Sequence, residues 1–414
     1  MNTPPLQRLP YLDGLRVVAF LLLVPYHVGM YYVSWDWHVK SAAASSVLEP
    51  FMLLTAPWRL GLLFLVAGAA CQGLAARRST PAALKDRTLR LLLPLFFGMA
   101  VIVPPQAYFE LLTKAPALLP GDGGYLDFWL AYLHGGRYCR GSDCLDVPTW
   151  NHLWFIAYLW PYTVAGIVLA ALQPGLSRLS WRPVLPGWAC LLLPAVLLAL
   201  ARVFVFPHHP STHNLFHDLY NHVQYGGLFA LGWLSRTPVA GGLWAAALRW
   251  RWAALGAALA GWAVLVAYFI HYADSAPPHA LLVAQRVLWG TLSWCAIVAA
   301  CGWAQRVFTV ESPGLRRAGA AVFCLYVLHQ TVIVLLTQAL RPLALPWGLE
   351  AVLLIVLTLA ICALAYAVLR RVPGLALLTG IQRRPQTDAR WWWPVSVSST
   401  AMRPRASVTS QRPR

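Results

Sequence analysis

The sequence predicts an all-α polytopic membrane protein, with about ten transmembrane helices in one bundle and both termini in the cytoplasm. Of the 414 residues, 59% are hydrophobic and 11% are charged, and the mean hydropathy is +0.58. The hydrophobic residues form repeated runs of about 20, which is the length that a helix needs to cross a bilayer. This composition excludes a soluble globular protein.

The net charge of +18 does not indicate a nucleic-acid partner. The basic residues lie in short clusters between the hydrophobic runs, which is typical of the cytoplasmic loops of membrane proteins. We therefore expect the lipid bilayer, and no nucleic acid, among the partners of the chain.

The first hydrophobic run, which follows Tyr11, carries an arginine and a histidine. Arg16 and His27 are eleven residues apart. In a helix they lie about 16 Å apart along the axis and on nearly the same face. Titratable groups within membrane helices are costly, so they indicate a site with a polar route to it. Pro25 cannot donate to the carbonyl of Leu21, which predicts a kink beside His27. An arginine that snorkels and a histidine that only packs are the alternative.

Short breaks separate the predicted spans, and the sixth span is the shortest. The spans are 15–33, 51–76, 89–109, 151–172, 186–206, 220–235, 253–272, 281–304, 319–339 and 348–369. An even number of spans places both termini on one side of the membrane. The breaks on that side hold thirteen lysines and arginines, against five in the opposite breaks. The positive-inside rule therefore assigns the termini to the cytoplasm.

The break at 110–150 is rich in glycine and lies on the periplasmic side in this topology. Cys139 and Cys144 sit there in a polar stretch, in a compartment that permits a disulfide. The gap of four residues between them is short, so the sequence leaves this bond open. The other six cysteines lie in apolar runs, where we expect them to pack.

The break after the fifth span is rich in histidine. His209, His213 and His217 recur every four residues, a spacing that would suit a metal ion on one helical face. Only Asp218 adds an obvious further ligand, so solvated loop histidines are the favoured interpretation. No metal site is predicted.

The chain divides into a transmembrane domain at 1–380 and a basic tail at 381–414. The tail is rich in arginine, serine, threonine and proline, and we expect it to be disordered. Its Trp391–Trp393 could lie at the lipid headgroups, with the arginines near anionic lipid. A terminus without function is the alternative.

Three stretches together resemble the acyltransferase-3 family of bacterial inner-membrane enzymes, which acylate cell-surface and periplasmic carbohydrates. Arg16 and His27 reproduce the family's pattern of an arginine, ten residues and a histidine. Asn151–Phe155 matches a His-Leu-Trp-Phe signature. Tyr326–His329 is similar to a Tyr-x-x-His element near the last helices of the family.

Further stretches support this resemblance. Arg87–Arg90 followed by Pro94 looks like the basic entry to the family's third helix. Phe64–Gly68 resembles its Phe-x-x-Ser-Gly element, but Ala67 replaces the serine and weakens any role for a hydroxyl there. Within the family, the chain looks nearest to the branch that succinylates periplasmic glucans, through Tyr11–Asp13, Trp37–Ser41 and Arg59.

The resemblance implies transfer of an acyl group from cytoplasmic acyl-coenzyme A to a carbohydrate hydroxyl across the membrane. Acyl-coenzyme A is then a co-substrate, and no bound cofactor is expected. Arg16, Arg87 and Arg90 would offer planar guanidinium groups to the coenzyme A phosphates. Ordinary positive-inside topology is the alternative for Arg87 and Arg90. His27 is the candidate general base, Arg16 is the other member of the candidate catalytic set, and a covalent acyl-histidine is a second possibility.

The acceptor side of the expected site comes from other spans. His152 and Trp154 open the fourth span, where the indole could stack on a sugar. A tryptophan of the interfacial belt is the alternative for Trp154. His38 and His329 are expected to support the same acceptor site.

Arg59 is a candidate donor-binding residue that would recognise the acyl group. It lies 18 residues before Arg77 in the second span. That separation is about 27 Å in a helix, which places Arg59 near the outer edge of the hydrocarbon. A succinyl group ends in a carboxylate that an arginine would bind, whereas an acetyl group does not. Snorkelling, or pairing with Glu49 or Glu110, is the alternative.

A secondary transporter or flippase is the competing function. In it, His27 and Arg16 would relay protons and couple them to solute movement. This alternative does not explain three enzyme-like motifs, and the sequence shows none of the repeated halves that many transporters have.

Overall fold

The computed structural model describes residues 9–141, 143–176 and 184–381, so the expected basic tail lies outside the described residues from residue 382 onward. The described part of the chain is helical apart from one two-stranded sheet and the connecting segments. Nine of its helical stretches are long and apolar enough to cross a membrane. The predicted all-α, polytopic membrane fold is confirmed.

The helices before residue 177 are α1 (Pro10–Tyr32), α2 (Glu49–Thr55), α3 (Arg59–Ala75), α4 (Thr80–Phe97), α5 (Pro104–Lys114), α6 (Tyr125–His134) and α7 (Trp154–Leu176). The later helices are α8 (Gly187–Leu200), α9 (Leu219–Asn221), α10 (Gly227–Leu234), α11 (Leu243–His271), α12 (His279–Val307), α13 (Pro313–Leu340), α14 (Trp347–Leu369) and α15 (Pro373–Leu378). The strands are β1 (Gly136–Arg140) and β2 (Asp143–Val147). Turns of π-helix occupy Gly98–Ile102, Ala201–Val205 and His222–Gly226, and 3₁₀ turns occupy Ser46–Leu48, Pro116–Leu118, Asn151–Leu153 and Arg341–Leu343.

The sixth expected span, 220–235, is helical but shorter than the others. It consists of α9, a π-helical turn and α10, and runs from Leu219 to Leu234. It is not among the nine stretches that satisfy the length of a membrane span in the described residues. Within the bundle, α10 packs against α3 and α7.

Two glycines let the backbones of α10 and α3 pack directly against each other. A Cβ atom on Gly68 would overlap the carbonyl oxygen of Phe229, and one on Gly232 would overlap that of Leu65. Small residues commonly allow such close contact between membrane helices. This packing gives a structural reason for the glycine that ends the Phe64–Gly68 motif.

The second expected span is interrupted. Its helical stretch covers Ser46–Ala75, but α2 ends at Thr55 and α3 begins at Arg59. Pro57 lies in the break and has no backbone N–H to continue a helix. The interruption places Arg59 at the first residue of a new helix.

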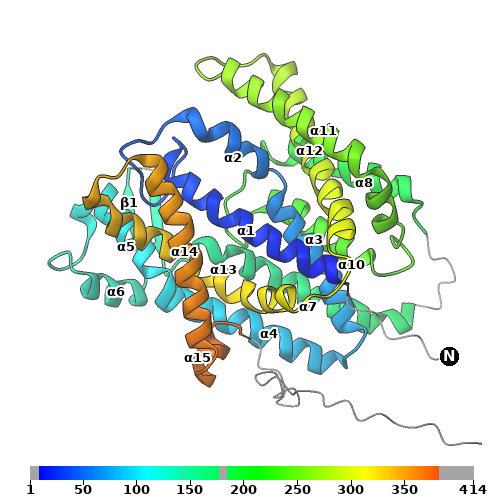
Figure 1. The fold of residues 1–414 in the computed structure, drawn as a ribbon, viewed down its shortest axis with the longest axis horizontal. Coiled ribbons are helices and arrows are strands. Elements are labelled where there is room, and N and C mark those ends of the chain that lie inside the picture. The colour runs from blue at the N-terminus through cyan, green and yellow to red at the C-terminus, as the bar shows by residue number, and fades with distance from the viewer. Residues whose placement is uncertain (1–8, 142, 177–183, 382–414) are drawn as a thin grey trace, which may run out of the picture. The chain divides into compact units, whose positions relative to one another are not determined.

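Helix α1 lies in the middle of the bundle (Figure 1). It contacts α2, α3, α12, α13 and α14. Phe20, Leu23, Val24 and Val28 are buried along it. Packing on several sides brings His27, in the C-terminal half of α1, next to side chains from distant parts of the chain.

The break at 110–150 folds into a small layer of its own. Phe128 and Tyr132 of α6 pack against Ala107 and Leu111 of α5. Strands β1 and β2 form an antiparallel hairpin, and a disulfide joins its cysteines, Cys139 and Cys144, which face each other in the register. The structure therefore resolves the bond that the sequence leaves open.

Candidate active site

The centre of the site is a pair of histidines. Nδ1 of His27, on α1, lies 2.8 Å from Nε2 of His329, on α13. The two rings stack with their centroids 5.0 Å apart and an angle of 25° between their planes. The packing of α1 against α13 creates this contact between residues 302 positions apart.

The hydrogen-bond partners of the two histidines indicate which ring nitrogens carry a hydrogen. His329 Nδ1 lies 2.7 Å from the backbone oxygen of Tyr326, which can only accept, so Nδ1 carries the hydrogen. In neutral His329, Nε2 is then an acceptor, and His27 Nδ1 donates to it. This assignment leaves a lone pair on His27 Nε2, which has no hydrogen-bond partner among the described residues. That nitrogen is able to accept a proton.

His152 lies beside this pair, with its ring centroid 5.3 Å from that of His329. Its Nε2 lies 3.1 Å from the backbone oxygen of Val327, and its Nδ1 lies 3.3 Å from Nε2 of Gln106. His152 therefore donates through Nε2 and accepts through Nδ1. Tyr326 donates its hydroxyl proton to the backbone oxygen of His152. Both ring nitrogens of His152 are engaged with groups of the protein.

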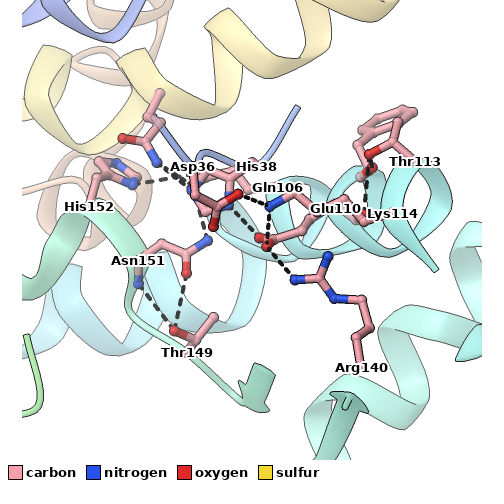
Figure 2. Close-up of polar contacts among 12 residues, drawn as sticks. Asp36, His38, Gln106, Glu110, Thr113, Lys114, Arg140, Thr149, Asn151 and His152 are labelled. Atoms are coloured by element: carbon pink, nitrogen blue, oxygen red, sulfur yellow. Dashed lines mark hydrogen bonds and ion pairs between the residues drawn. The ribbon is translucent and has the colours of Figure 1, made fainter. Parts of the chain in front are cut away.

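Gln106, on α5, is a fully buried centre of hydrogen bonding (Figure 2). Its amide nitrogen donates to Thr331 Oγ1 at 2.6 Å as well as to His152. Its amide oxygen accepts from Asn151 Nδ2 at 3.2 Å and from Gln330 Nε2 at 3.0 Å. All four hydrogen-bonding positions of the amide are thus occupied.

His38 connects the hydrogen bonds around Gln106 to a cluster of charged side chains nearer the β1–β2 hairpin (Figure 2). Its Nε2 lies 2.9 Å from the amide nitrogen of Gln330 and accepts from it, so its Nδ1 donates to Glu110 Oε2 at 2.6 Å. Glu110 Oε1 lies 3.2 Å from Lys114 Nζ and 3.8 Å from an Arg140 nitrogen. Both ring nitrogens of His38 are therefore engaged as well.

Arg59 lies against Tyr26, the residue before His27, and is 5% exposed. Its guanidinium carbon is 3.1 Å from the centroid of the Tyr26 ring, and its charge interacts electrostatically with His27. Its Nε and Nη1 are buried and have no hydrogen-bond partner in the described chain. Glu49 instead bonds to Ser34, and Glu110 bonds to the groups above, so neither expected carboxylate pairs with Arg59.

The three arginines expected to bind the donor gather near the start of α1. Arg87 interacts electrostatically with Arg16 and with Arg90. Arg16 lies 3.4 Å from Asp13, and Arg90 Nε lies 3.0 Å from Asp86. Arg87 Nε is buried without a hydrogen-bond partner among the described residues. The structure therefore brings Arg87 within electrostatic range of Arg16, in the half of α1 that does not carry His27.

A family model described as an acyltransferase domain matches residues 9–367 of the chain. The chain belongs to this acyltransferase family. It is 28% identical, over 163 residues, to the glucans biosynthesis protein C of Escherichia coli K12, and equally to that of the strains SMS-3-5 and O1:K1. The matched segment covers 38% of this chain and 38% of each of these relatives. No solved structure matches the chain significantly.

Trp154 of this acyltransferase is 8% exposed at the first residue of α7. The ring of His213 covers it, with centroids 4.4 Å apart. The backbone N–H of His213 donates to Asp218 Oδ2 at 2.9 Å, and the Tyr158 hydroxyl donates to the same oxygen at 2.6 Å. In this structure, Trp154 therefore lies beneath a segment that Asp218 holds in place.

The histidine-rich break of the acyltransferase is irregular between residues 206 and 218. The spacing of His209, His213 and His217 therefore does not place them on one helical face. No group of three or more histidine, cysteine, aspartate or glutamate side chains in the described ranges could hold a metal ion.

Gln106, Glu110, Gln330 and Thr331 are members of this site that sequence reasoning missed. All four lie in or next to apolar runs. Polar side chains within membrane spans are themselves a signal of a site, and that signal could have found Gln106 and Gln330.

Proposed function

We propose that this protein transfers an acyl group from cytoplasmic acyl-coenzyme A to a hydroxyl of a periplasmic or cell-surface carbohydrate, in the bacterial inner membrane. One observation carries the proposal. Of the four clustered histidines, only His27 keeps a ring nitrogen without a hydrogen-bond partner in the described chain. The acyltransferase family and the relatives named for glucan biosynthesis favour a carbohydrate acceptor.

His27 Nε2 is the general base in this proposal. It takes the proton of the acceptor hydroxyl as the oxygen attacks the thioester carbonyl. The carbon–sulfur bond then breaks, and the coenzyme A thiolate leaves with the proton that His27 releases. His329 accepts the hydrogen bond from His27 Nδ1 and holds the ring in the reactive tautomer, as the third group of a catalytic triad does. A covalent acyl-histidine would use the same nitrogen as nucleophile.

The donor enters from the cytoplasmic end of α1. Arg16, Arg87 and Arg90 bind the phosphates of coenzyme A, because guanidinium groups bind phosphate through paired hydrogen bonds. An extended pantetheine arm then covers the distance of about 16 Å along α1 to His27. Arg16 therefore acts on the phosphate end of the donor, about 16 Å along α1 from His27.

The roles of the other histidines follow from their occupied nitrogens. His38, His152 and His329 keep the site in its geometry, because each ring donates and accepts within the protein.

The carbohydrate is bound from the periplasmic side near the start of α7. Trp154 offers its indole face to the sugar when the covering segment around His213 moves away.

Arg59 selects the acyl group. Its buried guanidinium lacks a carboxylate partner in the described chain and lies close to His27, where the acyl group reacts. The terminal carboxylate of a succinyl group would supply the missing hydrogen bonds, whereas an acetyl group has no such atom. A succinyl donor is therefore preferred over an acetyl donor.

The proposal is tested with the purified protein in lipid nanodiscs, given acyl-coenzyme A with a radiolabelled acyl group and an oligomeric glucan acceptor. We expect label to appear in the glucan as an alkali-labile ester, with release of free coenzyme A. A transporter or flippase would instead move solute across proteoliposomes without forming an ester. Bound acyl-coenzyme A that never yields labelled acceptor, with transport of unmodified solute, would overturn the proposal.

A further inference from the structure

Gln106 joins three elements that surround the histidine pair. It lies on α5, and its amide reaches His152 and Asn151 in the turn before α7, and Gln330 and Thr331 on α13. Its exposed fraction is 0%, so its amide is shielded from bulk water. A buried amide with every donor and acceptor satisfied fixes its neighbours strongly, because any shift leaves polar atoms unpaired.

Each partner of Gln106 is next to, or is itself, one of the site histidines. Gln330 and Thr331 directly follow His329 along α13, and Asn151 directly precedes His152. The amide therefore sets the position of the helical turn that carries His329. The position of this helical turn determines the geometry of the hydrogen bond from His27 Nδ1 to His329 Nε2.

We propose that Gln106 is a positioning residue of the acyl-transfer reaction. It holds the His329 turn and His152 so that His27 keeps its proton on Nδ1 and presents an unprotonated Nε2 to the acceptor hydroxyl. Gln106 itself touches neither His27 nor the reacting atoms. This inference rests on the proposed role of His27 as the base.

Methionine is the most informative replacement for Gln106. It has nearly the same length and volume, but it removes two donors and one acceptor at once. Gln106→Met leaves His152 Nδ1 without its donor. It also removes the hydrogen bonds that connect Gln330 and Thr331, next to His329, to α5. Gln285→Met, on α12, is the matched control, because Gln285 is also buried and bonds to none of the site histidines in the described chain.

The first measurement maps histidine reactivity with diethyl pyrocarbonate, which acylates imidazole nitrogens that carry a free lone pair. Modified residues are located by mass spectrometry of the full-length protein in nanodiscs. In the wild type we expect modification of His27 and protection of His38, His152 and His329. In Gln106→Met we expect His152 to become reactive, while Gln285→Met keeps the wild-type pattern.

The second measurement is kinetic. Misplacing a reacting group by about 1 Å costs on the order of 100-fold in rate, so Gln106→Met should lower kcat by roughly 10- to 100-fold. KM for acyl-coenzyme A should stay unchanged, since Gln106 bonds to none of the donor-binding arginines. Thr331→Val, which removes one acceptor of the Gln106 amide, should lower kcat less, and Thr331→Ser should restore it because the hydroxyl returns.

The outcomes separate this inference from the proposed function. Wild-type kcat and a wild-type modification pattern in Gln106→Met would overturn the inference while leaving His27 as the base. A lower kcat with an unchanged pattern would assign Gln106 a structural role only and would also overturn it. If Gln106→Met fails to insert into the membrane, the comparison of Thr331→Val with Thr331→Ser is decisive instead. Equal activity of these two variants counts against the inference. Turnover in a His27→Ala variant would instead remove the proposed function itself.

Discussion

Arg59 carries a positive charge in a place where a charge is costly. An ion buried in a protein loses several kcal/mol of hydration. The contact with the Tyr26 ring returns about 2 kcal/mol, which does not balance that loss. Nε and Nη1 are unpaired in the described chain, which is why we propose that an anionic group of the substrate binds there.

We predict that Arg59→Leu erodes the preference for a succinyl donor over an acetyl donor. A hydrogen bond to a charged group contributes about 1.5–3 kcal/mol, so the ratio of kcat/KM for the two donors should fall by roughly 10- to 100-fold. Arg59→Lys, which keeps the charge but loses the planar fork, should fall between the wild type and Arg59→Leu. Kinetics with both coenzyme A thioesters measure the ratio. An unchanged ratio, or acetyl as the better wild-type donor, would end this assignment.

The residues of the site differ in how far the sequence predicts them. The alignment of Arg16 with His27 follows from the period of a single helix and could be predicted. The contact of His27 with His329 joins residues 302 positions apart, and no local pattern encodes which helices pack together. For the same reason, the sequence shows that Gln106 interrupts an apolar run but does not predict its four hydrogen bonds.

Among the elements, the β1–β2 hairpin is held by its disulfide and by an ion pair between Arg137 and Asp146. The hairpin also carries Arg140 to the Glu110 cluster that contacts His38. A disulfide restricts the unfolded loop that it closes, and a loop of this length gives roughly 2 kcal/mol.

We therefore predict that Cys139→Ser opens the hairpin locally without unfolding the membrane helices. Amide hydrogen exchange at 136–147 should accelerate by about 30-fold, which corresponds to roughly 2 kcal/mol. Cys295→Ser, which removes a cysteine that forms no disulfide, is the control for loss of a thiol. Equal exchange rates in Cys139→Ser and the wild type would show that the disulfide does not order this element.

The break between α2 and α3 shows why helix ends are harder to predict than helices. Hydropathy is continuous through this stretch, so a single span is expected from composition. Pro57 was the local signal for an interruption, because it lacks the N–H that a continuing helix needs. The break brings Arg59 to the start of α3 and next to Tyr26.

For the whole molecule, the basic residues predict which ends of the helices face the cytoplasm. Reporter fusions after residues 80 and 310 should show cytoplasmic activity, and fusions near 125 and 275 should show periplasmic activity. The short α9–α10 segment is the part of this topology that most needs the measurement, because it is shorter than a membrane span. A reversed pattern would place the arginine cluster on the wrong side for a cytoplasmic donor.

The central claim is that His27 Nε2 moves the proton in acyl transfer. The most direct test is single-turnover transfer from radiolabelled acyl-coenzyme A to a glucan acceptor by the wild type and by His27→Ala, at equal yield and membrane insertion. Loss of a general base commonly costs about 10²- to 10⁴-fold in rate, and we predict a loss of that size with donor binding retained. Transfer by His27→Ala at a rate close to that of the wild type would contradict the account.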